Sequence, residues 1–157
     1  MNSHMTSTYR HTQPGTLIRV AIGAGVILAF VLSATTEGHP IAIAVGAALL
    51  VCMVLFHSLT AEVDTHAVRI WFGPGIIHRS FSTASIREAA TVRSPWYYGW
   101  GVRRYPGGWL FNVSGLDAVE ITLDDGRRYR IGTNEPEKLL AAIQAARSNL
   151  DPSPQTV

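Results

Sequence analysis

Two long apolar stretches dominate the first third of the chain, at residues 17–35 and 41–59. Each holds roughly 19 residues, and a bilayer core of about 30 Å needs about 20 helical residues. Residues 36–40 between them include Gly38 and Pro40, which favour a tight turn. The pattern predicts a membrane α-helical hairpin of two spans over residues 17–59, after an N-terminal tail of residues 1–16.

Two other interpretations of these stretches fit less well. A cleaved signal peptide has an apolar core of about 7–15 residues, and here a longer run is followed at once by a second one. A buried hairpin of a soluble protein normally keeps a polar helix face, and neither stretch has one. We therefore expect both helices to face lipid.

Small residues recur at four-residue spacing in both predicted spans, and such rows allow helices to pack closely in lipid. The first row is Gly25, Ala29 and Ser33, and the second begins with Ala42 and Gly46. Their simplest use is contact between the two helices of one hairpin. Contact between subunits, giving a homo-oligomer, is the alternative.

The flanking charges predict the orientation of the hairpin. Arg10 and Arg19 lie on its N-terminal side, and Arg69 and Arg79 follow it. The turn between the spans has no Lys or Arg, and its charged residue is Glu37. Because Lys and Arg concentrate on the cytoplasmic side, both termini are expected to face the cytoplasm. The chain is thus predicted to be a multi-pass protein of the cell inner (plasma) membrane, and residues 1–5 (MNSHM) look like an expression-vector scar.

From residue 60 the pattern changes to a period of two, typical of β-strands. Val68, Ile70 and Phe72 alternate with more polar neighbours, a Gly-Pro-Gly turn follows at residues 73–75, and residues 76–81 return. Residues 85–93 are less regular, but Thr91 and Val92 favour a strand.

The clearest hairpin joins residues 118–123 to residues 127–131 through Asp124, Asp125 and Gly126. A helix follows, with Asn134 as its expected cap and Glu137 completing a capping box. Its apolar stripe consists of Leu139, Leu140, Ile143 and Ala146. Residues 60–150 therefore form an α+β domain of about six or seven strands and one amphipathic helix, and residues 151–157 are expected to be a disordered tail.

Three stretches carry a resemblance to a known family: residues 99–103 (GWGVR), 113–120 (VSGLDAVE) and 125–136 (DGRRYRIGTNEP). In these the chain resembles small bacterial membrane proteins that have a pleckstrin-homology-like (PH-like) domain behind two N-terminal transmembrane helices. The resemblance covers residues 17–147 and implies an antiparallel β-barrel or sandwich capped by a C-terminal amphipathic helix. Most proteins of this kind have no assigned biochemical activity, so the resemblance implies little about function. Phosphoinositide binding is not carried over, because the turn at residues 73–75 lacks the basic residues of the PH-domain loop.

One segment, residues 94–111, is rich in aromatic and cationic side chains separated by glycines. Trp and Tyr favour the bilayer interface, and Arg can pair with lipid phosphate. An aromatic loop that dips into the headgroup region is one interpretation, and packing inside a small barrel is the other. The candidate membrane- or partner-contact residues are Trp96, Tyr97, Tyr98, Trp100, Arg103, Arg104, Tyr105 and Trp109.

Composition and motifs narrow the function classes. The net charge of +2 with balanced charges in the domain argues against a nucleic-acid partner. The six histidines are scattered and Cys52 is the one cysteine, so we expect no metal site and no disulfide within the chain. No GxSxG, P-loop or GxGxxG motif occurs, which argues against an enzyme or a bound cofactor. Arg127, Arg128 and Arg130 form a second basic group, which is either a further contact surface or, as we expect, a solvated outer face beside Glu120 and Asp124, with which the arginines could pair across the hairpin.

These observations favour a membrane-anchored, non-catalytic binding module. The hairpin would hold the PH-like domain at the cytoplasmic membrane surface, where membrane lipids or another membrane protein would be its partner. The alternative is a structural or assembly protein that forms homo-oligomers through its helical hairpin.

Overall fold

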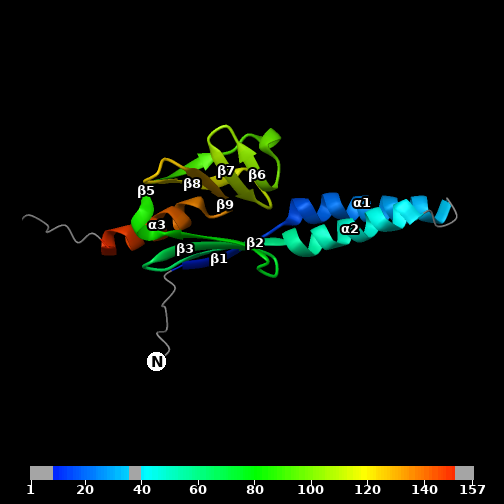
Figure 1. Cartoon of the computed structure of the whole chain (residues 1–157), viewed down its shortest axis with the longest axis horizontal. Coiled ribbons are helices and arrows are strands. Elements are labelled where there is room, and N and C mark those ends of the chain that lie inside the picture. The colour runs from blue at the N-terminus through cyan, green and yellow to red at the C-terminus, as the bar shows by residue number, and fades with distance from the viewer. Residues whose placement is uncertain (1–8, 36–39, 151–157) are drawn as a thin grey trace, which may run out of the picture.

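The computed structural model of the chain describes residues 9–35 and 40–150 (Figure 1). Among these residues the fold is α+β, with one sheet of four strands, one of five strands and three α-helices. The predicted scar at residues 1–5, the turn residues 36–39 and the predicted tail at residues 151–157 lie outside the described residues.

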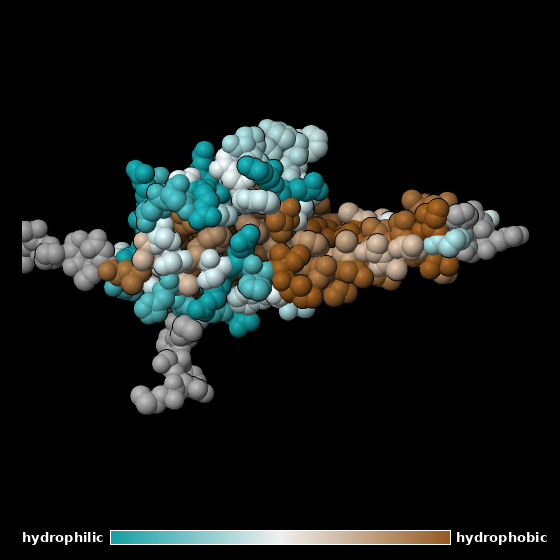
Figure 2. All heavy atoms as spheres, viewed as in Figure 1, coloured by the Kyte–Doolittle hydropathy of each residue, from teal (hydrophilic) through white to brown (hydrophobic). Residues whose placement is uncertain are grey.

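The helices α1 (Thr16–Thr35) and α2 (Pro40–Phe56) lie side by side and project from one end of the β-domain (Figure 1). Both are apolar over their visible surface (Figure 2), and Ala29 is the one buried residue of α1. With 20 residues, α1 is long and apolar enough to span a membrane, whereas α2 has 17 residues and is shorter. Length and composition thus support one span, near the N-terminus.

The second predicted span extends too far along the chain. The helix ends at Phe56, and Ser58 and Leu59 already belong to strand β2 (Ser58–Val63). Leu59 is 1% exposed and lies in the core of the domain, where it contacts protein rather than lipid. Hydropathy cannot separate these two kinds of apolar environment, because both favour the same side chains.

The four-stranded sheet has the order β1-β2-β3-β4 and is antiparallel throughout. Strands β3 (Ala67–Phe72) and β4 (Ile77–Ser82) confirm the predicted hairpin around residues 73–75. The predicted N-terminal tail of residues 1–16 is wrong for its second half, since β1 (Tyr9–Pro14) pairs with β2 along its whole length. Pro14 faces Ser58 in this register, so the antiparallel contact of the two helices continues into the sheet.

The five-stranded sheet has the order β5-β8-β9-β7-β6. Its strands are β5 (Ile86–Arg93), β6 (Gly101–Tyr105), β7 (Gly108–Asn112), β8 (Asp117–Leu123) and β9 (Arg128–Gly132). The predicted hairpin of β8 and β9 is confirmed. From β2 onward the described residues hold eight strands rather than the six or seven expected for residues 60–150, and β7 runs parallel to β9 where an antiparallel arrangement was expected.

Helix α3 (Pro136–Leu150) packs between the two sheets and contacts β2, β5 and β8. Leu139 and Ile143 of its predicted apolar stripe are fully buried in the core. The predicted cap is wrong by one residue, because the carbonyl of Glu135 accepts the first helical hydrogen bond from the Leu139 amide. The Asn134 side chain instead lies 2.7 Å from Nε2 of His11, which ties β1 to the start of this helix.

Candidate functional site

The end of the domain nearest the helices is where both of them join the sheets. The Gly15 amide donates to the carbonyl of His57 at 2.8 Å, which holds the start of α1 against the end of α2. The Gly73 amide in the β3–β4 turn donates to the Ser58 carbonyl at 2.9 Å. A Cβ on Gly73 would come within 2.6 Å of the Val54 carbonyl oxygen, so this turn sits directly on the last turn of α2.

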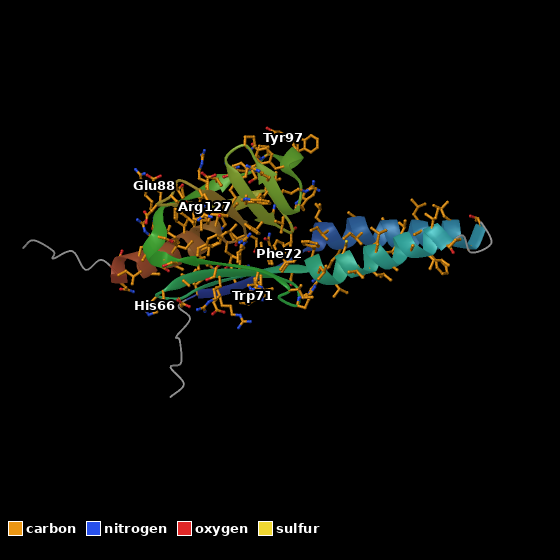
Figure 3. All side chains as sticks on the ribbon, in the orientation of Figure 1. His66, Trp71, Phe72, Glu88, Tyr97 and Arg127 are labelled. Atoms are coloured by element: carbon orange, nitrogen blue, oxygen red, sulfur yellow. The ribbon has the colours of Figure 1, made fainter. Side chains whose placement is uncertain are left out.

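A short 3-10 helix, η2 (Trp96–Tyr98), precedes β6 and exposes two large aromatic side chains. Trp96 is 73% exposed and Tyr97 is 68% exposed. Figure 3 shows Tyr97 at the end of the domain from which the helices project, whereas Glu88 and His66 lie toward the opposite end. Exposed aromatic side chains at this position suit a membrane interface, where the polar edge of the ring contacts water and the rest of the ring contacts lipid.

Trp100 and Arg103 follow η2 and face the first turns of α1. They line a groove of about 570 Å³ together with Leu17, Ile18, Ala21, Ile22, Phe56, Gly99, Gly101 and Val102. The indole N–H of Trp100 donates to the Gly115 carbonyl at 3.3 Å, and Nε of Arg103 donates to the Trp100 carbonyl at 3.2 Å. Both side chains are therefore held in place by backbone acceptors.

The β3–β4 turn adds one residue that sequence analysis missed. Ile76 is 73% exposed although it is a large aliphatic residue. The available signal was that Ile76 and Ile77 are consecutive, which breaks the alternation of a half-buried strand. We refer to Ile76, Trp96, Tyr97, Trp100 and Arg103 together as the rim.

Arginine predominates in the stretches of sequence that form the rim, while the exposed Asp117 faces Arg93, three residues before Trp96. Residues 65–87 and 94–116 contain no Asp or Glu, while both stretches contain arginine. The acidic residue Glu88 lies away from the helices in Figure 3. The stretches that form the rim are thus rich in arginine and aromatic residues, a combination suited to anionic headgroups.

Several of the predicted contact residues lie elsewhere. Tyr105 is 8% exposed and packs on the outer face of the five-stranded sheet, so it is not a surface contact. Half-buried Tyr98 packs against it with the two rings tilted, at 5.7 Å between ring centroids. Arg104 is exposed on β6 and does not line the groove. Trp109, 42% exposed, does not line the groove but a neighbouring hollow of about 320 Å³, which includes the rim residue Ile76 and shares Val102 with the groove.

Tyr105 belongs to a polar cluster centred on Glu120. The Tyr105 hydroxyl donates to Oε2 of Glu120 at 2.9 Å, and Nε of Arg130 donates to the same oxygen at 2.6 Å. The guanidinium of Arg130 also lies 4.4 Å from the centre of the Tyr105 ring. A Cβ on Gly107 would come within 2.6 Å of that ring, so the absence of a side chain there lets the ring lie across the sheet.

Burial and hydrogen bonding act on the pKa values of this cluster. Burial raises the pKa of Glu120, but the hydrogen bonds from Arg130 and Tyr105 and the nearby arginine charges outweigh it, and the net pKa lies below its usual value. Burial, together with the bond to the Glu120 carboxylate, raises the pKa of Tyr105 to about 12. The predicted pairing of Glu120 with the arginines of β9 is confirmed. These side chains therefore interact with one another within the domain.

This cluster predicts a stability change in acid. Because the folded-state pKa of Glu120 is lowered, its stabilising effect is complete above its unfolded value of about 4.5 and is lost as the pH falls through the folded value. We expect Glu120→Gln to reduce the melting temperature at pH 7 and to flatten its fall between about pH 5 and pH 3. The measurement is the melting temperature of the full chain across this range.

The matched control for this change is Glu88→Gln on the neighbouring strand β5, where the side chain is exposed. That variant should keep the acid slope of the parent protein. An unchanged slope in Glu120→Gln would show that the Glu120 interactions do not contribute to acid stability.

The small residues of the two helices lie at their mutual contact. A Cβ on Gly46 would lie 3.6 Å from Cβ of Ala29, and one on Gly25 would lie 3.1 Å from Cδ1 of Leu49. Ala29 is buried, and Ser33 and Ala42 are half-buried. These residues therefore allow close packing of α1 on α2 within one chain.

No group of three metal-ligating side chains occurs within residues 9–35 and 40–150. Cys52 is exposed on α2. No family model matches this chain, and a search of curated proteins gives no match. Function is therefore inferred from the chemistry of the site itself.

Proposed function

We propose that this protein is a membrane-anchored, non-catalytic binding module whose domain lies on the cytoplasmic membrane surface and contacts lipid headgroups through the rim. The observation that carries the proposal is that exposed aromatic and basic side chains gather where two exposed apolar helices leave the domain. The exposed apolar helices and the exposed aromatic rings would both be unfavourable in water alone, since contiguous apolar surface of this size is rare in soluble monomers. A bilayer around the helices would satisfy both at once.

The proposal includes two spans. Although α2 is shorter than α1, its 17 residues are at the lower end of the length that crosses a bilayer. It packs along α1, and aliphatic side chains such as Ile41, Ile43 and Val51 are exposed on it, whereas Phe56 at its end packs against the domain core. An apolar helix paired with a spanning helix has no aqueous surface to face, which favours a hairpin with both ends of the chain on the cytoplasmic side.

The PH-like relationship also remains a proposal. It rests on the sequence resemblance, and two sheets followed by a C-terminal helix that closes the core are compatible with it. The extra strands and the parallel β7–β9 pair depart from the expected pattern. The homo-oligomer alternative has no such support, because Gly25 and Gly46 are already used within the hairpin.

Single-cysteine variants of the full chain test the proposed placement. In a Cys52→Ser background, cysteine is introduced in place of Thr35 at the end of α1, Tyr97 in the rim, or Ser148 in α3. After labelling with an environment-sensitive fluorophore in vesicles, we expect strong quenching by headgroup-attached spin label at residue 97 and none at residue 148. An impermeant reagent should reach residue 35 only from the side opposite residue 148.

The Ser148→Cys variant is the matched control, since α3 lies at the opposite end of the domain from the helices (Figure 1). Equal quenching at residues 97 and 148 would contradict contact between the rim and the membrane. Access to residues 35 and 148 from the same side would contradict the two-span hairpin.

A further inference from the structure

The groove between α1 and β6 has the composition of a lipid site. Apolar side chains from α1, α2 and β6 line it, among them Leu17, Ala21, Phe56 and Val102. Its volume of about 570 Å³ is within the range of small-molecule sites in proteins. The groove is at the first turns of α1, where that helix would leave the headgroup region for the hydrocarbon.

The side of the groove formed by β6 is fixed by hydrogen bonds to one loop. The carbonyl of Gly115 accepts both the Trp100 indole N–H at 3.3 Å and the Asn112 side-chain amide at 3.0 Å. Nε2 of Gln13 donates to the Ser114 carbonyl at 2.8 Å, which ties the same loop to the strand before α1. The groove is thus pre-formed, and a ligand would not have to order it.

Arg103 is the one charged residue of the lining, and no acidic side chain lines the groove. Its Nε donates to the Trp100 carbonyl, and no described carboxylate forms an ion pair with it within residues 9–35 and 40–150. Its guanidinium lies over Gly99, within about 4 Å of where a Cβ would be. The terminal nitrogens remain as donors, and a guanidinium binds phosphate oxygens well.

We infer that this groove binds one anionic phospholipid, with the phosphate on Arg103 and an acyl chain along α1 between Leu17 and Ile22, against Trp100. The inference depends on the proposed function, because it needs α1 to be in a bilayer. A phospholipid is the occupant that fits, since the groove combines a cation with an apolar wall at the depth where headgroups and chains meet. The bound lipid would join the domain to the hairpin at the point where the two meet.

Tryptophan quenching by brominated lipid tests this inference. A full-chain variant that keeps only Trp100 (Trp71→Phe, Trp96→Phe, Trp109→Phe) is placed in vesicles of fixed phosphatidylcholine and phosphatidylglycerol content. Bromine is carried by one lipid or by the other. We expect the anionic lipid to occupy the site beside Trp100 about fivefold more readily, the preference that one arginine at an anionic surface supplies.

Two variants assign the preference to the groove. Arg103→Gln should remove it, whereas Arg104→Gln, the neighbouring exposed arginine outside the groove, should keep it. Ala21→Leu should narrow the groove by adding bulk to its apolar wall, and it should reduce quenching by both brominated lipids.

Equal quenching by both lipids in the single-tryptophan protein would overturn the inference while leaving the proposed anchoring in place. Loss of the preference in Arg104→Gln as complete as in Arg103→Gln would overturn it in the same way. Absence of quenching by either lipid would instead overturn the proposed function, because Trp100 would then not be at the membrane.

Discussion

Replacing Gly108 with alanine should lower the free energy of unfolding by about 4 kcal/mol, the largest effect expected of a single methyl group in this protein. A Cβ at this position would lie 1.9 Å from the carbonyl oxygen of Arg128 and 2.7 Å from its carbonyl carbon. Gly108 and Arg128 face each other where β7 and β9 pair in parallel. Because β9 is held on its other side by β8, its backbone cannot move away without breaking a second pairing.

Denaturant unfolding of the full chain in mild detergent, followed by tryptophan fluorescence, measures this change. The control is Gly126→Ala in the β8–β9 turn, where φ is 81° and no atom lies within 4 Å of the added Cβ. That variant should lose only about 1–2 kcal/mol, the cost of a left-handed backbone for alanine. A loss no larger in Gly108→Ala than in the control would contradict the close approach of β7 to β9.

Replacing Ile143 with alanine should lower the free energy of unfolding by about 3 kcal/mol, within the range for truncating a fully buried aliphatic side chain. Ile143 is 0% exposed and belongs to the core cluster formed by α3 and both sheets. The lost methylene and methyl groups would leave a cavity where α3 joins the two sheets, so α3 should lose protection against hydrogen exchange before the strands do.

The neighbouring residue provides the control. Gln144 is exposed, and Gln144→Ala should change the free energy of unfolding by less than about 0.5 kcal/mol. A loss below about 1 kcal/mol in Ile143→Ala would show that α3 does not close the core. Denaturant unfolding of the detergent-solubilised chain gives both values.

Elements made by local contacts could be predicted from the sequence. The β8–β9 hairpin follows from the alternation of apolar residues on both sides of a turn that ends in Gly126. The stripe that includes Leu139 and Ile143 predicts the buried face of α3 in the same way. In each case the residues that form the pattern lie within a short stretch of the chain, which is the range over which hydrophobic periodicity predicts secondary structure.

Strand β1 could not be predicted, because its residues are mostly polar and do not alternate in hydrophobicity. It forms because α1 and α2 pack together, which brings Pro14 beside Ser58 although more than forty residues separate them. The parallel pairing of β7 with β9 is similar, since the strand between them in sequence, β8, lies on the far side of β9. Pairings between distant segments leave no local pattern.

The sequence by itself determined that residues 94–111 combine aromatic and basic side chains and that two apolar helices precede the domain. Only the tertiary structure decided how that segment divides. Tyr105 hydrogen-bonds to Glu120 on the outer face of the five-stranded sheet, Trp96 and Tyr97 stay exposed, and Trp100 and Arg103 meet α1 in a groove. The reason is physical: composition sets what a side chain can contact, but its partners come from segments far away in the chain, and only their packing brings them within reach.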